Sequence, residues 1–97
     1  PSMIGTNSKL QNGVKISGPV LIGKNCSIGP NVTIGPNVSI GDNVSIKNSD
    51  IDNSIIMTDC KIDSKMHISN SIIPYRSEIS SSSSANLILS EDSKISL

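Results

Sequence analysis

The chain contains 97 residues, and its eight basic and eight acidic residues give no net charge. A length of this order predicts one domain. The charges are scattered singly, and no apolar run approaches the roughly 18 residues of a membrane-spanning helix. We therefore expect no nucleic-acid partner and no membrane span, and, since no secretory segment opens the chain, a cytoplasmic domain.

The apolar residues are almost entirely aliphatic. Tyr75 is the one aromatic residue, and Phe and Trp are absent. A globular core of this size usually uses aromatic bulk, whereas a core of stacked β-branched side chains does not need it. The composition favours such a stack.

An aliphatic residue recurs every six positions in the first half of the chain, at Ile4, Leu10, Ile16, Ile22, Ile28, Ile34, Ile40 and Ile46. A helix would scatter these residues around its axis, whereas an extended strand keeps evenly spaced residues on one side. A smaller apolar residue stands two positions earlier in most hexads, at Val14, Val20, Cys26, Val32, Val38 and Val44. Each hexad therefore predicts a short strand with two inward side chains.

A corner residue stands three positions before most of these aliphatic residues, at Asn7, Gly13, Asn25, Asn31, Asn37 and Asn43, with Pro19 as the exception. Asn and Gly tolerate a positive φ better than other residues. A bend every six residues predicts a triangular coil of three strands.

The coils shorten in the second half of the chain. Segments beginning at Asn53, Asn70 and Asn86 recur 17 and then 16 residues apart, which indicates that one side of each coil has lost a residue. The inward positions predicted there are Ile51, Ile56, Ile62, Ile68, Ile73, Ile79, Leu89 and Ile95. Ser80–Ser84 offers no apolar residue, and we expect a polar, loosely packed side there.

Residues 1–97 thus predict an all-β, single-stranded parallel β-helix of about five coils, shaped as a triangular prism. Pro1–Ile4 already lies within the repeat, so we expect the chain to be part of a longer protein.

Residues 22–44 resemble the left-handed β-helix of hexapeptide-repeat transferases. The region from Gly18 to Ile73, with its Asn-Ser-Ile-Ile segments, resembles the carboxyl-terminal domain of sugar-1-phosphate nucleotidylyltransferases. Within that family it is most similar to the long form of glucose-1-phosphate thymidylyltransferase, and the resemblance covers nearly the whole chain. Left-handedness is implied by the resemblance alone, because general crossover rules favour the right-handed sense.

The resemblance implies that catalysis belongs to an amino-terminal nucleotide-binding domain that this sequence lacks. That domain would bind Mg²⁺ and transfer a nucleotidyl group to a sugar 1-phosphate, as in dTDP-glucose synthesis. In the present chain we expect no catalytic, cofactor-binding or metal-binding residue. Its expected partners are further copies of itself and its own catalytic domain.

His67 is the single histidine and the one candidate general base. The alternative function is therefore an acyltransferase that acetylates an amino-sugar phosphate, with His67 in a groove between subunits. The pattern instead places His67 on the outer surface, and the neighbouring residues do not match the expected acyltransferase motif. A zinc site with three histidine ligands is excluded by the single histidine.

Other reactive residue types have structural interpretations. Cys26 and Cys60 are predicted inward on the same side two coils apart, roughly 9.5 Å, which is too far for a disulfide. A phosphate-binding loop is a single glycine-rich turn before a helix. The evenly spaced glycines are instead expected at corners, and they are Gly23, Gly29, Gly35 and Gly41. Four aspartates cluster in the sequence, at Asp50, Asp52, Asp59 and Asp63. We expect them in turns and not around a metal ion.

Some aliphatic residues are predicted to point outward, at Ile55, Met57, Ile72 and Leu87. Exposed apolar patches usually mark interfaces. The leading hypothesis is therefore a non-catalytic assembly domain that packs against a sister subunit or the catalytic domain.

Overall fold

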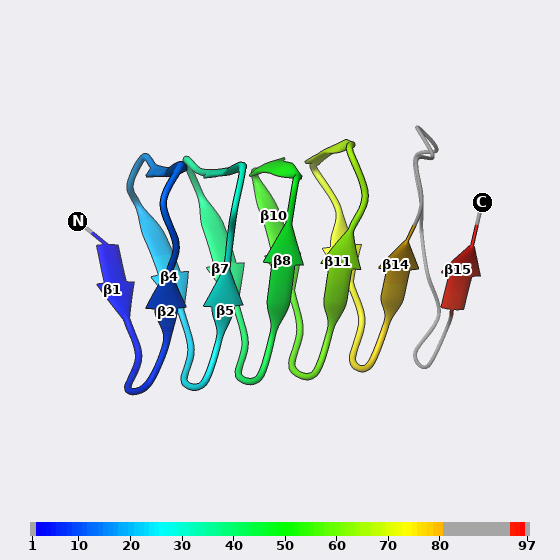
Figure 1. The fold of residues 1–97 in the computed structure, drawn as a ribbon, viewed down its shortest axis with the longest axis horizontal. Coiled ribbons are helices and arrows are strands. Elements are labelled where there is room, and N and C mark those ends of the chain that lie inside the picture. The colour runs from blue at the N-terminus through cyan, green and yellow to red at the C-terminus, as the bar shows by residue number, and fades with distance from the viewer. Residues whose placement is uncertain (1, 81–93, 97) are drawn as a thin grey trace.

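The structure is a computed structural model that describes residues 2–80 and 94–96. The described residues form fifteen short strands and no helix, so they include no helix that could cross a lipid bilayer. The strands assemble into three parallel sheets that wind about five times around one axis (Figure 1). The predicted β-helix is confirmed.

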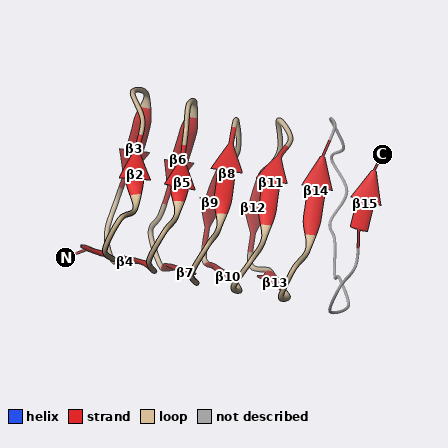
Figure 2. Cartoon of the chain, turned by 60° about the horizontal axis from the view of Figure 1, so that its bottom comes forward, coloured by secondary structure: helices blue, strands red, loops and turns tan. Residues whose placement is uncertain are grey.

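Each sheet forms one side of a prism, and its strands come from successive coils (Figure 2). The first sheet contains β1 (Ser2–Ile4), β4 (Val20–Ile22), β7 (Val38–Ile40), β10 (Ser54–Ile56) and β13 (Ile72–Ile73). The second contains β2 (Lys9–Leu10), β5 (Ser27–Ile28), β8 (Ser45–Lys47), β11 (Lys61–Asp63), β14 (Glu78–Ser80) and β15 (Lys94–Ser96). The third contains β3 (Val14–Ile16), β6 (Val32–Ile34), β9 (Asp50–Asp52) and β12 (His67–Ser69).

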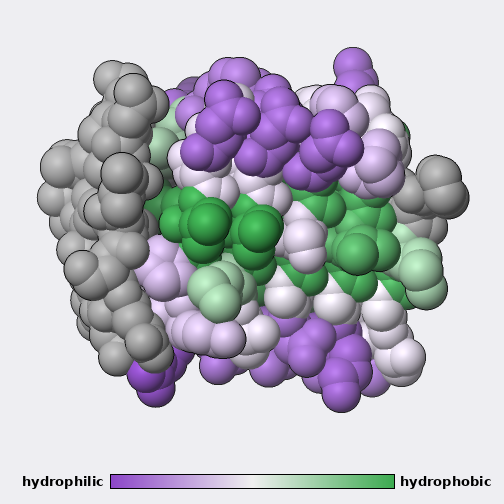
Figure 3. Space-filling view, turned by 180° about the vertical axis from the view of Figure 1, so that it is seen from behind, coloured by the Kyte–Doolittle hydropathy of each residue, from purple (hydrophilic) through white to green (hydrophobic). Residues whose placement is uncertain are grey.

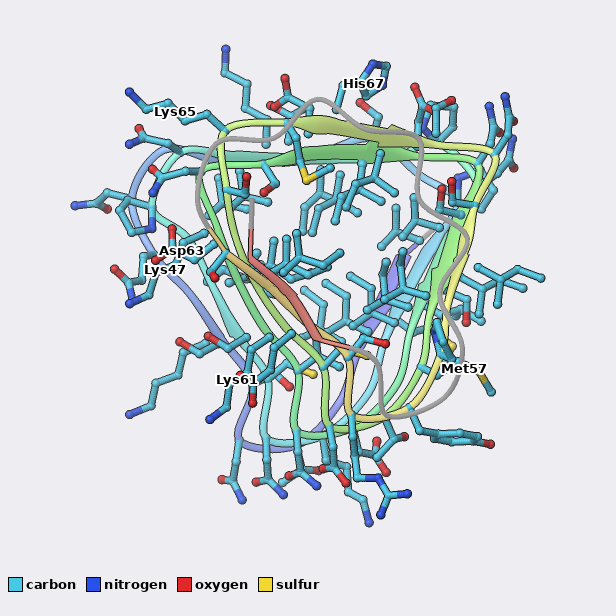
Figure 4. The ribbon with its side chains drawn as sticks, turned by 90° about the vertical axis from the view of Figure 1, so that its right-hand side faces the viewer. Lys47, Met57, Lys61, Asp63, Lys65 and His67 are labelled. Atoms are coloured by element: carbon cyan, nitrogen blue, oxygen red, sulfur yellow. The ribbon has the colours of Figure 1, made fainter. Side chains whose placement is uncertain are left out.

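The β-helix is left-handed. Viewed from the carboxyl-terminal end, the chain passes clockwise from Met57 through Lys61 and Asp63 to His67 while it advances toward the viewer (Figure 4). This is the left-handed sense, as the family resemblance implied.

The predicted inward residues from Val20 to Ile79 form the core, and the predicted inward Leu89 lies outside the described residues. Seventeen apolar residues from Val20 to Ile79 are buried in one cluster, and Ile28, Ile34, Ile46 and Ile56 have no exposed surface. Ile4 and Leu10 differ from the prediction, since they remain 45% and 39% exposed. Both lie in the first coil, where β1 and β2 each have a neighbouring strand on one side within the described residues.

The strand register confirms the change in coil length. Ile22 pairs with Ile40, 18 residues later, whereas Ile40 pairs with Ile56, 16 residues later. Ile56 then pairs with Ile73, 17 residues later. The expected polar side at Ser80–Ser84 lies outside the described residues except for Ser80, which ends β14.

Asparagine supplies most of the corners. Positive φ angles occur at Asn7, Asn25, Asn31, Asn37 and Asn43, as predicted, and also at Asn48, Asn53, Asp59, Asn70 and Arg76. The Gly–Pro bonds before three corners are cis, at Gly18–Pro19, Gly29–Pro30 and Gly35–Pro36. Corner carbonyls accept hydrogen bonds from the next coil, as in the 3.0 Å bond from the Asn48 N–H to the Pro30 oxygen.

Serine hydroxyls stabilise the shortened coils. Ser54 takes the inward position that Val38 holds in the previous coil, and it is 3% exposed. Its hydroxyl donates a 2.7 Å hydrogen bond to the Asp52 carbonyl across the corner at Asn53. Ser49 and Ser71 donate in the same way to Lys47 and Ser69. These bonds satisfy the buried hydroxyls of Ser49 and Ser54 and the half-buried hydroxyl of Ser71 in the shortened coils.

Candidate interaction face

The three sides of the prism differ in the side chains that they present to solvent. The outer central row of the second sheet is polar or charged, with Lys9, Ser27, Ser45, Lys61 and Glu78 in register. The outer row of the third sheet is also polar, with Lys15, Thr33, Asp50 and His67 in register. The corresponding row of the first sheet is mainly apolar, with Met3, Leu21, Ser39, Ile55 and Ile72 in register.

We call this outer row of the first sheet the apolar ladder. Its members pair in register on adjacent strands, which places them one above another along the prism. Met3 is 69% exposed, Leu21 51%, Ile55 45% and Ile72 61%. Figure 3 shows the apolar band running along this side of the molecule between two hydrophilic borders. An aligned set of exposed aliphatic side chains of this kind is typical of an interface.

A shallow hollow adjoins the carboxyl-terminal half of the apolar ladder. It is lined by Ile55 and Ile72, by Ser54 and Ser71, and by the corner residues Asn37, Asn53 and Asn70. The Asn37 amide donates a 3.1 Å hydrogen bond to the Asn53 side-chain oxygen, which orders this edge. The lining of the hollow therefore combines exposed aliphatic side chains with side-chain amides.

The sequence predicted part of this face. Ile55 and Ile72 are exposed and aligned as expected, whereas Met57, on the adjoining corner, is half-buried. Leu87 lies outside the described residues. Leu21 and Met3 were missed, although their central position between two inward residues of a hexad is the signal that identifies them.

His67 lies on a different side of the prism, with its side chain 60% exposed. Its Nε2 lies 3.1 Å from Oδ2 of Asp52, and the Ser69 hydroxyl donates a 2.5 Å hydrogen bond to the other carboxylate oxygen. The Ser69 and His67 hydrogen bonds together hold the pKa of Asp52 below its ordinary value. Asp52 thus links the two side chains.

The base that this group offers to the Ser69 hydroxyl is the Asp52 carboxylate, which accepts its hydrogen bond. The lowered pKa of Asp52 makes this carboxylate a weak base. His67 is also absent from the residues that line the hollow. The geometry shows His67 and Asp52 as an exposed surface pair.

The two cysteines are free and buried on one stack, separated by Val44 in the intervening coil. The Cys26 thiol lies 3.1 Å from the Gly41 carbonyl oxygen, and the Cys60 thiol lies 3.0 Å from the Pro74 oxygen. Burial raises the pKa of the Cys60 thiol. Both act as small apolar residues with a weak donor.

The glycines allow close contact between coils. A Cβ on Gly23 would lie 2.6 Å from the Gly41 carbonyl oxygen, and one on Gly41 would lie 2.7 Å from the Thr58 hydroxyl. Among residues 2–80 and 94–96, no three His, Cys, Asp or Glu side chains are grouped so that they could hold a metal ion.

The described residues form a left-handed parallel β-helix domain built from hexads, and the apolar ladder lies on one of its three sides. A family model described as the GMPPB C-terminal domain matches residues 16–96. The chain belongs to this family of left-handed β-helix domains related to sugar nucleotidyltransferases. No curated protein and no solved structure matched the chain.

Proposed function

We propose that this chain is the structural and oligomerisation domain of an enzyme that makes a nucleotide-activated sugar. The observation that carries the proposal is the apolar ladder, which is exposed on one side of the prism while the other two sides are polar. The family match supports the link to sugar nucleotidyltransferases. The domain would join subunits through this side and hold its own amino-terminal catalytic domain in place.

The proposed reaction of the whole enzyme takes place in that catalytic domain. A phosphate oxygen of a sugar 1-phosphate would form a bond to the α-phosphorus of a nucleoside triphosphate, and pyrophosphate would leave. The resemblance of the Asn-Ser-Ile-Ile coils to the long form of glucose-1-phosphate thymidylyltransferase favours glucose 1-phosphate and dTTP as the substrates. It also implies Mg²⁺ in the catalytic domain, and we place the enzyme in the cytoplasm. The present chain would contribute assembly and no reacting group.

The test compares the full-length enzyme with this chain alone. Nucleotide-sugar formation is measured with glucose 1-phosphate and dTTP, and with other sugar 1-phosphates and nucleoside triphosphates. We expect the full-length enzyme to be active, this chain alone to be inactive, and Ile55→Lys to reduce the mass of the assembled enzyme. Normal assembly of the Ile55→Lys enzyme would contradict the role of this face.

The acyltransferase alternative is tested separately with acetyl-coenzyme A and an amino-sugar phosphate. His67→Ala removes the candidate base while it leaves the fold intact, because the side chain is mostly exposed. Thr33→Ala, in the same outer row, is the matched control. Acetyl transfer that His67→Ala abolishes and Thr33→Ala preserves would establish the alternative.

A further inference from the structure

The corner between β2 and β3 has a distinctive sequence, because Asn12 alone among the asparagines of the chain is followed by glycine. Asn12 and Gly13 are both exposed. Pro30 and Asn31, the equivalent residues of the next coil, are exposed as well, although β6 beside them pairs with a strand on each side. The exposure is therefore a property of this corner and not of its place in the first coil.

This corner is only loosely bound to the coil that follows it. One coil further on, the Asn48 N–H donates a 3.0 Å hydrogen bond to the Pro30 carbonyl oxygen. Within the described residues, no equivalent bond joins the Asn31 N–H to the Asn12 carbonyl, and the Asn12 side-chain amide has no hydrogen-bond partner. A Cβ on Gly13 would lie 3.7 Å from its nearest neighbour, the Asn31 nitrogen. The turn thus has room to change its conformation.

We propose that Asn12 is a site of spontaneous deamidation, at which the chain acquires aspartate and isoaspartate. The Gly13 backbone nitrogen loses its proton and attacks the side-chain carbonyl carbon of Asn12. The new C–N bond closes a succinimide ring, and the side-chain nitrogen leaves as ammonia with the proton that Gly13 lost. Water then opens the ring at either carbonyl, which yields aspartate or isoaspartate. Water is the single co-reactant.

Glycine favours the ring closure because it has no Cβ beside the attacking nitrogen. Valine follows the corner residues Asn31, Asn37 and Asn43, and its branched side chain crowds that nitrogen. Corners with this sequence are therefore poor sites for the reaction.

Serine is small and follows several asparagines, but hydrogen bonds restrain two of their side chains. The Asn48 Oδ1 accepts a 3.2 Å bond from the Asn31 amide, and the Asn48 amide donates a 3.1 Å bond to Oδ1 of Asp63. The Asn53 Oδ1 accepts a 3.1 Å bond from the Asn37 amide. Each side chain must break these bonds before it can turn back toward its own backbone, which opposes ring closure.

At the other two Asn-Ser pairs the attacking nitrogen is itself engaged. The Ser71 N–H, which follows Asn70, donates a 3.2 Å hydrogen bond to the Ser54 hydroxyl. The Ser8 N–H, which follows Asn7, donates a 3.4 Å bond within its own turn. The Asn-Gly pair therefore combines the smallest successor with an asparagine side chain that no described residue restrains.

The two products would affect the first coil differently. Aspartate adds a negative charge at an exposed corner and leaves the backbone unchanged. In isoaspartate the backbone passes through the side chain, which adds one atom to the link between β2 and β3. Val14 and Ile16 follow directly and pack against the core. Isoaspartate would therefore disturb the packing of β3, on a different side of the prism from the apolar ladder.

The test is to age the purified chain in mildly alkaline native buffer and to locate isoaspartate by peptide mass spectrometry and by an isoaspartate-specific methyltransferase. Cleavage after Lys9 and Lys15 releases residues 10–15, in which Asn12 is the single asparagine. Isoaspartate should accumulate first in this peptide. It should form faster as the pH rises, because the attacking amide nitrogen must lose its proton.

Asn12→Gln is the matched variant, since it keeps an amide at the exposed corner but its longer side chain would have to close a larger ring. It should lose the isoaspartate of residues 10–15. Gly13→Ala places a Cβ beside the attacking nitrogen and should slow the reaction roughly tenfold. Circular dichroism verifies that both variants retain the β-helix.

The same chain aged in urea separates the effect of the fold from that of the local sequence. Asn48 and Asn53 should form isoaspartate faster in urea than in the folded chain, because their hydrogen bonds are then lost. A folded chain that forms isoaspartate at either of them before Asn12 would overturn the proposal. So would a folded chain whose Asn12 stays intact while the unfolded chain reacts there. Neither result bears on assembly through the apolar ladder.

Discussion

Replacement of one central core isoleucine should destabilise the chain far more than the same replacement on the apolar ladder. Ile46 in β8 has no exposed surface and lies between Ile28 and Ile62 of the adjacent coils. Ile46→Ala removes three carbon atoms, worth about 2.4 kcal/mol at about 0.8 kcal/mol for each buried methylene. The cavity left behind adds to this loss, so we expect a total of about 3 to 4 kcal/mol.

Ile55→Ala is the matched control, because it removes the same atoms from an outward position. Ile55 is 45% exposed, and its loss leaves an open surface instead of a closed cavity. We expect a cost of about 1 kcal/mol or less when the chain is dilute enough to be monomeric. The free energy of unfolding is measured by urea denaturation with circular dichroism. Equal costs at the two positions would refute the assignment of inward and outward residues.

Three further predictions concern a corner, a surface carboxylate and a thiol. Gly35→Ala should destabilise the chain far more than Gly13→Ala. Both glycines have a positive φ, but only at Gly35 would a Cβ overlap a carbonyl oxygen of the preceding coil. Comparable urea midpoints of the two variants would contradict this. Ser69→Ala should raise the pKa of Asp52 toward 3.8, seen by carboxyl NMR titration. Because the folded pKa is lowered, the stability that Asp52 contributes is present above pH 3.8 and is lost as the pH falls through the folded value. The Cys60 thiol should react with a thiol reagent only after unfolding, and rapid labelling in native buffer would disprove its burial.

The hexad period was sufficient to predict most of the core. Strand residues at even spacing share a face, so Ile22, Ile28 and Ile34 could be placed inward from their positions alone. The exposure of Ile4 and Leu10 could not be predicted in this way. Burial in a solenoid depends on a neighbouring coil on each side, and the period within one coil carries no information about that.

The serines of the shortened coils were recognised in the sequence but their role was not. The pairs Asn48-Ser49 and Asn53-Ser54 share a spacing that places each hydroxyl near the carbonyl two residues earlier. Such side-chain to backbone bonds are a known property of serine near turns. The repeated Asn-Ser pair was the signal that could have predicted them.

The candidate interaction face was predicted only in part, because its composition depends on register. Ile55 and Ile72 stood out through their repeated segments, whereas Leu21 belongs to the same row only because β4 pairs with β7 and β7 pairs with β10. The pairing of His67 with Asp52 likewise joins residues from neighbouring coils. Contacts between coils follow from coil length, which changes along this chain.

The solution mass of the chain across a wide concentration range tests the assembly role of the apolar ladder most directly. Light scattering coupled to size exclusion should show a mass well above 10.2 kDa at high concentration, which falls toward this value on dilution. Ile55→Lys should remain near 10.2 kDa under the same conditions. Thr33→Lys, which places the same charge on the polar third sheet, should behave as the wild type. A folded wild-type chain with the monomer mass at every concentration would contradict self-assembly through this face.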